Sequence, residues 1–138
     1  MKFNTLLPEL YVESFERSIF FYSQILQWKI EYTRESPRFA FLSYFGSQIM
    51  IQELLPSDLE QEQLRPPYGK GMNFQIETPT VQKIIDQLKK HDYPLKRGIK
   101  ESWYEDGEVA YGCREILVSD PDGYLLRFSQ DVGEKILQ

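Results

Sequence analysis

Two charged residues near the end of the chain, Glu115 and Arg127, have the types and neighbours that could do chemistry. Arg127 stands alone among the apolar residues of 124–128, and Glu115 precedes Ile116. Alternation with a period of two is typical of a strand with two different faces. A carboxylate and a guanidinium on adjacent strands either pair with each other or contact a polar ligand. Both interpretations stay open, and both exclude a metal cation beside Arg127.

Other catalytic or metal-binding combinations are limited by composition. His91 is the only histidine and Cys113 the only cysteine among 138 residues. A two-histidine-one-carboxylate iron site and a three-histidine zinc site both need more histidines than one chain supplies. Cys113 has no partner for an internal disulfide, which favours a reducing compartment, and we interpret it as a small strand or loop residue.

The overall charge excludes one class of partner. The chain has a net charge of -5, a pI near 5.0, and no cluster of Lys and Arg. We therefore expect no nucleic-acid binding. No apolar run is long enough to span a bilayer, and residues 1–5 lack the features of a signal peptide. These observations predict a cytoplasmic protein that does not bind a membrane.

The elements that would position these residues follow the same order twice. The first half predicts a strand, a helix capped by Ser14, and three more strands, over residues 6–12, 15–27, 28–33, 39–44 and 48–54. The second half predicts a strand from Met72 and a helix capped by Thr80. A strand over 93–100, a loop over 103–107 and closing strands over 110–128 complete it. The chain is therefore predicted to be an internal duplication.

A polar connector rich in proline and glycine separates the two halves. Ser57 and Glu60 fit a capping box, which predicts one short helix within it. We assign residues 6–56 to a first βαβββ module, 57–71 to the linker and 72–130 to a second module. Together they form one domain over 1–138, of the α+β class, with a curved mixed sheet around a cleft. The connector could also act as a lid.

Strand alternation selects the residues that should line this cleft. They are the side chains on the strand faces opposite the helices: Glu9, Tyr11, Phe39, Phe41, Ser43, Asn73, Gln75, Glu115, Leu117, Leu125 and Arg127. The mixture of aromatic and polar groups suits a polar, ring-containing small molecule better than a lipid. Phe39 and Phe41 could equally be ordinary core residues, because Ala40 and Leu42 are also apolar.

Three segments resemble the vicinal oxygen chelate superfamily, also called the glyoxalase/bleomycin resistance/dioxygenase superfamily. They are residues 8–18 leading into 21–22, residues 112–115, and the Asp120-Pro121-Asp122-Gly123 turn followed by Tyr124. The segment at 112–115, with that turn and Arg127-Phe128, looks most like the bleomycin resistance branch. The resemblance implies the paired βαβββ fold.

Enzymes of this superfamily bind a divalent metal through one residue from each of four strands. The resemblance places these positions near Leu7, at Gln52 or Glu53, near Asn73, and at Arg127. Leucine cannot bind a metal, asparagine is a weak neutral ligand, and arginine offers only donors. We therefore expect no metal and no cofactor, and a binding protein is favoured over an enzyme.

The resemblance to bleomycin resistance proteins implies a homodimer that sequesters a drug-like ligand between subunits. It also implies antibiotic resistance as the role of the protein. It places Phe39, Phe41 and Trp103 as stacking surfaces and Glu9, Glu115 and Arg127 as polar contacts. Trp103 could instead anchor a loop. The alternatives are a metal-dependent glyoxalase- or dioxygenase-type enzyme, or a metabolite-binding regulatory or accessory protein.

Overall fold

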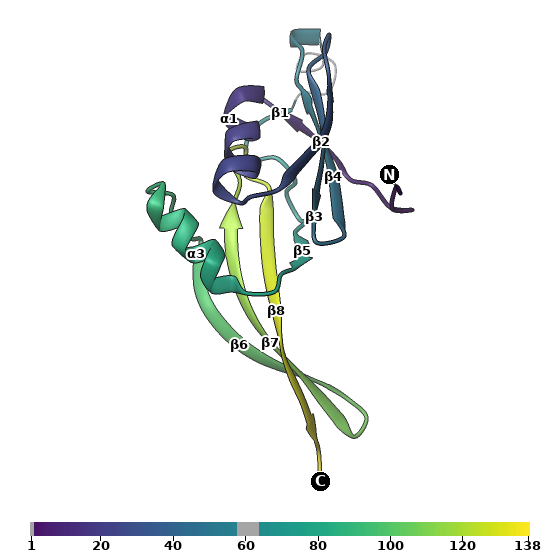
Figure 1. Ribbon diagram of the computed structural model, residues 1–138, viewed down its shortest axis with the longest axis vertical. Helices are drawn as coiled ribbons and strands as arrows, with labels where there is room; N and C mark the ends of the chain where they lie inside the picture. Colours follow the sequence, from purple (N-terminus) through teal and green to yellow (C-terminus); the bar gives the residue numbers. More distant parts are fainter. Residues whose placement is uncertain (1, 58–63) are drawn as a thin grey trace. The chain divides into compact units, whose positions relative to one another are not determined.

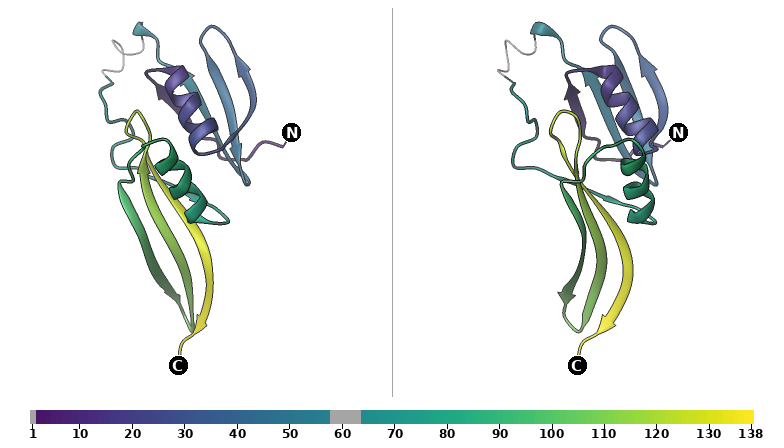
Figure 2. Two further views of the ribbon diagram at one scale, coloured as in Figure 1. Left: turned by 60° about the vertical axis from the view of Figure 1, so that its left-hand side comes forward. Right: turned by 90° about the vertical axis from the view of Figure 1, so that its left-hand side faces the viewer.

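The computed structural model describes residues 2–57 and 64–138, which form two compact units (Figures 1 and 2). Unit 1 consists of the chain up to Lys70 together with Asp120–Tyr124. Unit 2 consists of Gly71–Ser119 and Leu125–Gln138. Each unit contains one four-stranded sheet. No helix in the described part of the chain is long and apolar enough to cross a membrane.

The sheet of unit 1 has the strand order β1-β4-β3-β2. Its strands are β1 (Glu9–Val12), β2 (Lys29–Arg34), β3 (Phe39–Tyr44) and β4 (Ser47–Glu53). β1 pairs with β4 in parallel, and the other pairs are antiparallel. The alternation predicted from sequence is present, because Leu10, Val12, Ile49 and Ile51 are all buried.

A helical segment follows β1 in unit 1. Helix α1 (Phe15–Ile19) begins at Ser14, whose hydroxyl accepts a hydrogen bond from the backbone N–H of Arg17, so the predicted cap is confirmed. The segment continues as a π-helix, η1 (Phe20–Ile25). The wider turn rotates the buried stripe, so Phe21 and Ile25 are buried while Ile19 is only half-buried. Phe15, Tyr22 and Leu26, which follow the regular helical period, are buried as well.

The sheet of unit 2 has the equivalent order, β5-β8-β7-β6. Its strands are β5 (Phe74–Glu77), β6 (Arg97–Asp106), β7 (Val109–Ser119) and β8 (Leu125–Ile136). Helix α3 (Val81–Lys90) follows β5, and its cap is Thr80, as predicted. β5 pairs with β8 in parallel, as β1 pairs with β4. Two βαβββ modules with the same strand order confirm the predicted fold class.

The boundaries of the last strands differ from the prediction. β6 begins at Arg97 rather than Tyr93 and continues through residues 103–106, which were expected to be a loop. Pro94 has no N–H to donate, and the backbone N–H of Lys96 donates to Leu117 O at 2.8 Å just before β6 begins. The true turn lies at Gly107, with a φ of +67°. The short helix predicted from Ser57 falls mostly on residues 58–63, outside the described residues.

The turn between β7 and β8 is packed within unit 1, although its flanking strands belong to unit 2. Asp120 Oδ1 accepts hydrogen bonds from the backbone N–H groups of Asp122 and Tyr124, and its Oδ2 accepts one from the Tyr22 hydroxyl at 2.7 Å. Gly123 has a φ of +94°, and a Cβ there would lie 2.3 Å from Pro67 Cβ. Glycine is therefore required here both for the backbone conformation and for space.

The second aspartate of this turn binds the beginning of α1. Asp122 accepts hydrogen bonds from the backbone N–H of Glu13 at 3.0 Å, from the Ser18 hydroxyl at 3.2 Å and from Arg17 at 3.3 Å. Burial raises the pKa of Asp122, although these donors act in the opposite direction. The turn that resembles the superfamily pattern is thus a structural connection that returns the chain from unit 2 to unit 1.

Candidate functional site

A partly buried ion pair lies on the sheet face of unit 2 that is opposite the core. Ile116 and Phe128 are fully buried on the core face, so the alternating residues Glu115 and Arg127 lie on the other face. Arg127 Nη1 is 3.7 Å from Glu115 Oε2. The side chain of Glu115 is 5% exposed and that of Arg127 34%. The sequence-predicted pairing of these residues is therefore present.

Tyr104, on the neighbouring strand β6, contributes a second partner to this carboxylate. Its hydroxyl donates a hydrogen bond of 2.9 Å to Glu115 Oε1. The hydrogen bond to Glu115 raises the pKa of Tyr104, so the phenol stays protonated and remains a donor at neutral pH. Glu115 is held between a phenol and a guanidinium, which is how a buried charge is compensated.

A hollow of about 330 Å³ opens on the same face of unit 2, next to this ion pair. It is lined by residues of β5, β7 and β8: Gln75, Glu77, Tyr111, Gly112, Cys113, Ser129 and Asp131. In register, Gln75 is directly opposite Arg127, Ser129 opposite Glu115, and Asp131 opposite Cys113. The hollow and the ion pair are therefore parts of one surface.

The chemistry of the hollow is suited to binding rather than to nucleophilic attack. Burial raises the pKa of the Cys113 thiol, so the reactive thiolate is disfavoured at neutral pH. Glu77 and Asp131 provide carboxylates, Gln75 an amide, and Tyr111 a half-exposed aromatic ring. Such a lining can accept several hydrogen bonds and stack against a ring.

Several of these residues were not among the sequence-predicted site residues. Tyr111 and Cys113 precede Glu115 by four and two positions, and Ser129 and Asp131 follow Arg127 by two and four. The same strand alternation that placed Glu115 and Arg127 on the cleft face also places these four residues there. Ser129 and Asp131 were missed because the last strand was expected to end at Phe128, whereas β8 continues to Ile136. Tyr111 and Cys113 lay inside the predicted strands, but the alternation was not followed back to them.

Asn73, predicted to line the cleft, lies just before β5 and not within it. Gln75 is the residue of β5 that is directly opposite Arg127. Asn73 and Gln75 both carry an amide that can accept or donate hydrogen bonds, so a polar side chain lies beside Arg127 in either case. The structure brings Gln75, rather than Asn73, next to Arg127.

Trp103 does not lie with Glu115. It belongs to β6, where it is directly opposite Gly112 and adjacent to Tyr104, so alternation turns it to the other face of the sheet. Its ring covers Gly112, where an added Cβ would be 2.6 Å from the indole. Lys135 Nζ lies 3.8 Å from the ring centroid. The expected loop position of Trp103 is wrong, because β6 extends through it.

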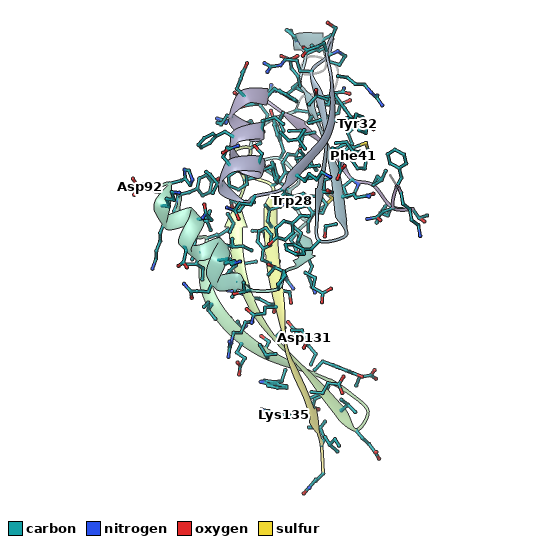
Figure 3. All side chains as sticks on the ribbon, viewed as in Figure 1. Trp28, Tyr32, Phe41, Asp92, Asp131 and Lys135 are labelled. Atoms are coloured by element: carbon teal, nitrogen blue, oxygen red, sulfur yellow. The ribbon has the colours of Figure 1, made fainter. Side chains whose placement is uncertain are left out.

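In unit 1, the predicted residues share the sheet face opposite α1, but the aromatic rings are covered. Phe41 is fully buried and stacked on Tyr32 at a centroid distance of 5.3 Å (Figure 3). The rings of Phe3 and Phe41 make an edge contact. Phe39 is 5% exposed, and the Arg34 guanidinium lies 4.7 Å from its centroid. Neighbouring residues of unit 1 therefore already contact both rings.

The polar members of that face are more accessible. Glu9 is exposed, and Tyr11 is half-buried. The Ser43 hydroxyl donates a hydrogen bond of 2.8 Å to Glu31 Oε1, which lowers the pKa of Glu31. In register, Tyr11 is directly opposite Gln52 on β4, and Gln52 is opposite Phe39 on β3. These residues form a continuous mixed surface within unit 1.

The four positions expected to hold a metal in enzymes with this fold do not fit a divalent cation. Leu7 has no donor atom, and Gln52 and Asn73 provide only neutral amides. Glu53, the alternative to Gln52, accepts a hydrogen bond of 3.2 Å from the backbone N–H of Arg38. Arg127 is a cation that already contacts Glu115. Across residues 2–57 and 64–138, no group of three His, Cys, Asp or Glu side chains is arranged to hold a metal ion.

The sequence model of the Glyoxalase/Bleomycin resistance protein/Dioxygenase superfamily matches residues 2–128. The chain therefore belongs to this superfamily, in agreement with its two βαβββ modules. No curated protein matches the chain.

Solved structures share the fold at low sequence identity. A virulence protein from Salmonella typhimurium is 19% identical with a TM-score of 0.64, covering 96% of this chain and 100% of that chain. A fosfomycin resistance protein from Listeria monocytogenes is 20% identical with a TM-score of 0.62, covering 96% and 94%. The trypanothione-dependent glyoxalase I of Leishmania major is 20% identical with a TM-score of 0.58, covering 94% and 87%. At these identities the likeness shows the fold alone.

Proposed function

We propose that the protein is a metal-free small-molecule-binding member of the superfamily, which sequesters a polar, ring-containing ligand. The observation that carries this proposal is the ion pair between Arg127 and Glu115, separated by 3.7 Å. Arg127 stands at the position where the resemblance places a metal-binding carboxylate. A guanidinium there would repel a cation and is already compensated by Glu115.

The hollow next to the ion pair supports a polar ligand. Glu77 and Asp131 can accept hydrogen bonds, Gln75 can both donate and accept, and Tyr111 offers a ring face. The residues that line the hollow include two carboxylates, Glu77 and Asp131, while the adjacent Arg127 is paired with Glu115. This charge distribution favours neutral or cationic ligands over anions. Bleomycin is the first compound to test, because the superfamily includes bleomycin resistance proteins. A homodimer with the ligand between subunits remains part of this proposal.

The metal-free character can be tested on the purified protein and on Arg127→Glu. We expect no stoichiometric zinc, nickel, manganese or iron by elemental analysis. We also expect no nickel or zinc uptake by Arg127→Glu in calorimetric titration, because Leu7 and Asn73 still supply no anionic ligand. Stoichiometric metal in either protein would favour the alternative, a metal-dependent glyoxalase- or dioxygenase-type enzyme.

Ligand binding can be tested by thermal shift with bleomycin and a panel of polar aromatic compounds. A ligand that binds only the folded state at 100 times its Kd should stabilise it by about 2.7 kcal/mol, so Tm should rise with concentration. Tyr111→Ala should reduce this rise, while Lys83→Ala, on the exposed side of α3, should not. If bleomycin well above micromolar concentration leaves Tm unchanged, the antibiotic-resistance part of the proposal fails. Equal shifts in both variants would exclude the hollow.

A further inference from the structure

The dipeptide Asp-Gly occurs twice in the chain, at Asp106-Gly107 and at Asp122-Gly123. Such a dipeptide is chemically labile, because the backbone nitrogen of the glycine can attack the side-chain carboxyl group of the aspartate. Glycine has no Cβ that would hinder this approach. The reaction needs a free carboxyl group and a free backbone N–H, and the two dipeptides differ on both counts.

The first dipeptide lies where β6 turns into β7, at the end of the sheet that is distant from helix α3 (Figure 1). Asp106 is exposed and is the last residue of β6, directly opposite Val109. Within the described residues, its carboxylate forms no hydrogen bond or ion pair, and the backbone N–H of Gly107 donates to no acceptor. A Cβ added at Gly107 would have no atom within 4 Å. Both reacting groups are therefore free to approach each other.

The second dipeptide is closed to the same reaction by its contacts within unit 1. Asp122 is 2% exposed, and its carboxylate accepts hydrogen bonds from three donors at the beginning of α1. The backbone N–H of Gly123 donates a hydrogen bond of 3.0 Å to the carbonyl oxygen of Asp120. The attacking nitrogen and the carboxyl group that it would attack are both held by other partners.

We propose that Asp106 is a site of spontaneous conversion to isoaspartate in the folded protein. The Gly107 nitrogen forms a bond to the side-chain carboxyl carbon of Asp106. The proton of the nitrogen and the hydroxyl of the protonated carboxyl group leave as water, which gives a cyclic succinimide. Water from the solvent then opens the ring. Cleavage of the new C–N bond restores aspartate, whereas cleavage of the original peptide C–N bond gives isoaspartate, so the reaction needs no oxidant or reductant.

The product changes the turn in which it forms. In isoaspartate the main chain runs through the side-chain methylene group, so the backbone between Asp106 and Gly107 gains a carbon atom. Because the length of a hairpin turn sets the register of its strands, we expect the pairing of Asp106 with Val109 to be lost. The former main-chain carbonyl becomes a free carboxylate, which is the group that a carboxyl methyltransferase specific for isoaspartate modifies.

Labelling with heavy oxygen compares the two dipeptides in one sample. The full chain is incubated at neutral pH in water enriched in heavy oxygen and then digested with trypsin in ordinary water, which gives peptides 101–114 and 115–127. Mass spectrometry with electron-transfer fragmentation locates the label and separates isoaspartate from aspartate. Asp106 should react more than about tenfold faster than Asp122, which can react only when its native contacts open. Asp106→Glu is the control, and its peptide should stay unlabelled because a glutamate would have to form a larger ring.

The same incubation in concentrated guanidinium chloride shows whether the structure decides the difference. Both dipeptides should react at similar rates in the unfolded chain. An unlabelled Asp106 in the folded protein would overturn the proposal, and so would equal labelling of Asp106 and Asp122. Slow reaction of Asp122 in the unfolded chain would also overturn it, because local sequence would then protect that dipeptide. These outcomes do not depend on any ligand, so they are separate from the test of the proposed function.

Discussion

Replacing Asp120 by asparagine tests the buried turn between β7 and β8. Asp120 accepts two backbone hydrogen bonds through Oδ1 and one from Tyr22 through Oδ2. Asparagine keeps the shape and one acceptor oxygen, and its amide can donate to the Tyr22 oxygen. The substitution therefore removes the titratable charge while it preserves most of the geometry.

The size of the expected change in the free energy of unfolding follows from the pKa of Asp120. Burial raises this pKa from 3.8 to about 6, and the charges of Asp122 act in the same direction. The hydrogen bonds from Tyr22 and from the backbone N–H groups of Asp122 and Tyr124 partly oppose the shift. Since one pKa unit corresponds to about 1.4 kcal/mol, the full effect on the free energy of unfolding is about 3 kcal/mol.

The direction in which stability changes with pH follows from proton binding by Asp120 in the folded and unfolded states. Between about pH 4 and pH 6, Asp120 holds a proton in the folded state but not in the unfolded state. Its contribution to stability is therefore greatest at low pH and is lost as the pH rises through about 6. The wild type should lose up to about 3 kcal/mol relative to Asp120→Asn across this window.

Urea unfolding of both proteins from pH 4 to pH 7.5, followed by circular dichroism, measures this difference directly. Carboxylates that do not interact with Asp120 titrate alike in both proteins and cancel in the comparison. Asp122 interacts with Asp120, so its titration contributes a smaller part of the difference. Two free-energy curves that run parallel over the whole range would refute the reasoning, because they would show that Asp120 has an ordinary pKa.

Two further predictions concern packing. Gly112→Ala should lower the free energy of unfolding by about 1–3 kcal/mol, because the added Cβ would lie 2.6 Å from the Trp103 ring. Gly98→Ala, with no atom within 4 Å of the added Cβ, is the control and should change stability by less than about 1 kcal/mol; equal effects would contradict the role of Trp103. Phe41→Ala should cost about 3–5 kcal/mol in urea unfolding, because Phe41 is fully buried against Tyr32. A cost below about 1 kcal/mol would show that this face is loosely packed.

The duplicated architecture could be predicted from local pattern. Alternation in Leu10–Val12 and Phe74–Ile76, and the caps Ser14 and Thr80, depend on interactions within a few residues. They therefore report strands and helix starts without knowledge of the tertiary structure. The π-helical turn of η1, which buries Phe21 and Ile25, could not be predicted in this way, because it depends on tertiary packing and not on the local helical period.

The sequence by itself excluded metal binding by residue 127, since the guanidinium of Arg127 offers only hydrogen-bond donors and no ligand atom. Only the tertiary structure decided its partners: the third member of the cluster, Tyr104, is 11 residues from Glu115 and reaches it across β6 and β7. Strand register also decided that Trp103 turns away from Glu115 while Tyr111 and Asp131 join the hollow. Register depends on where strands begin, bulge and end, and those points are set by pairing between distant segments.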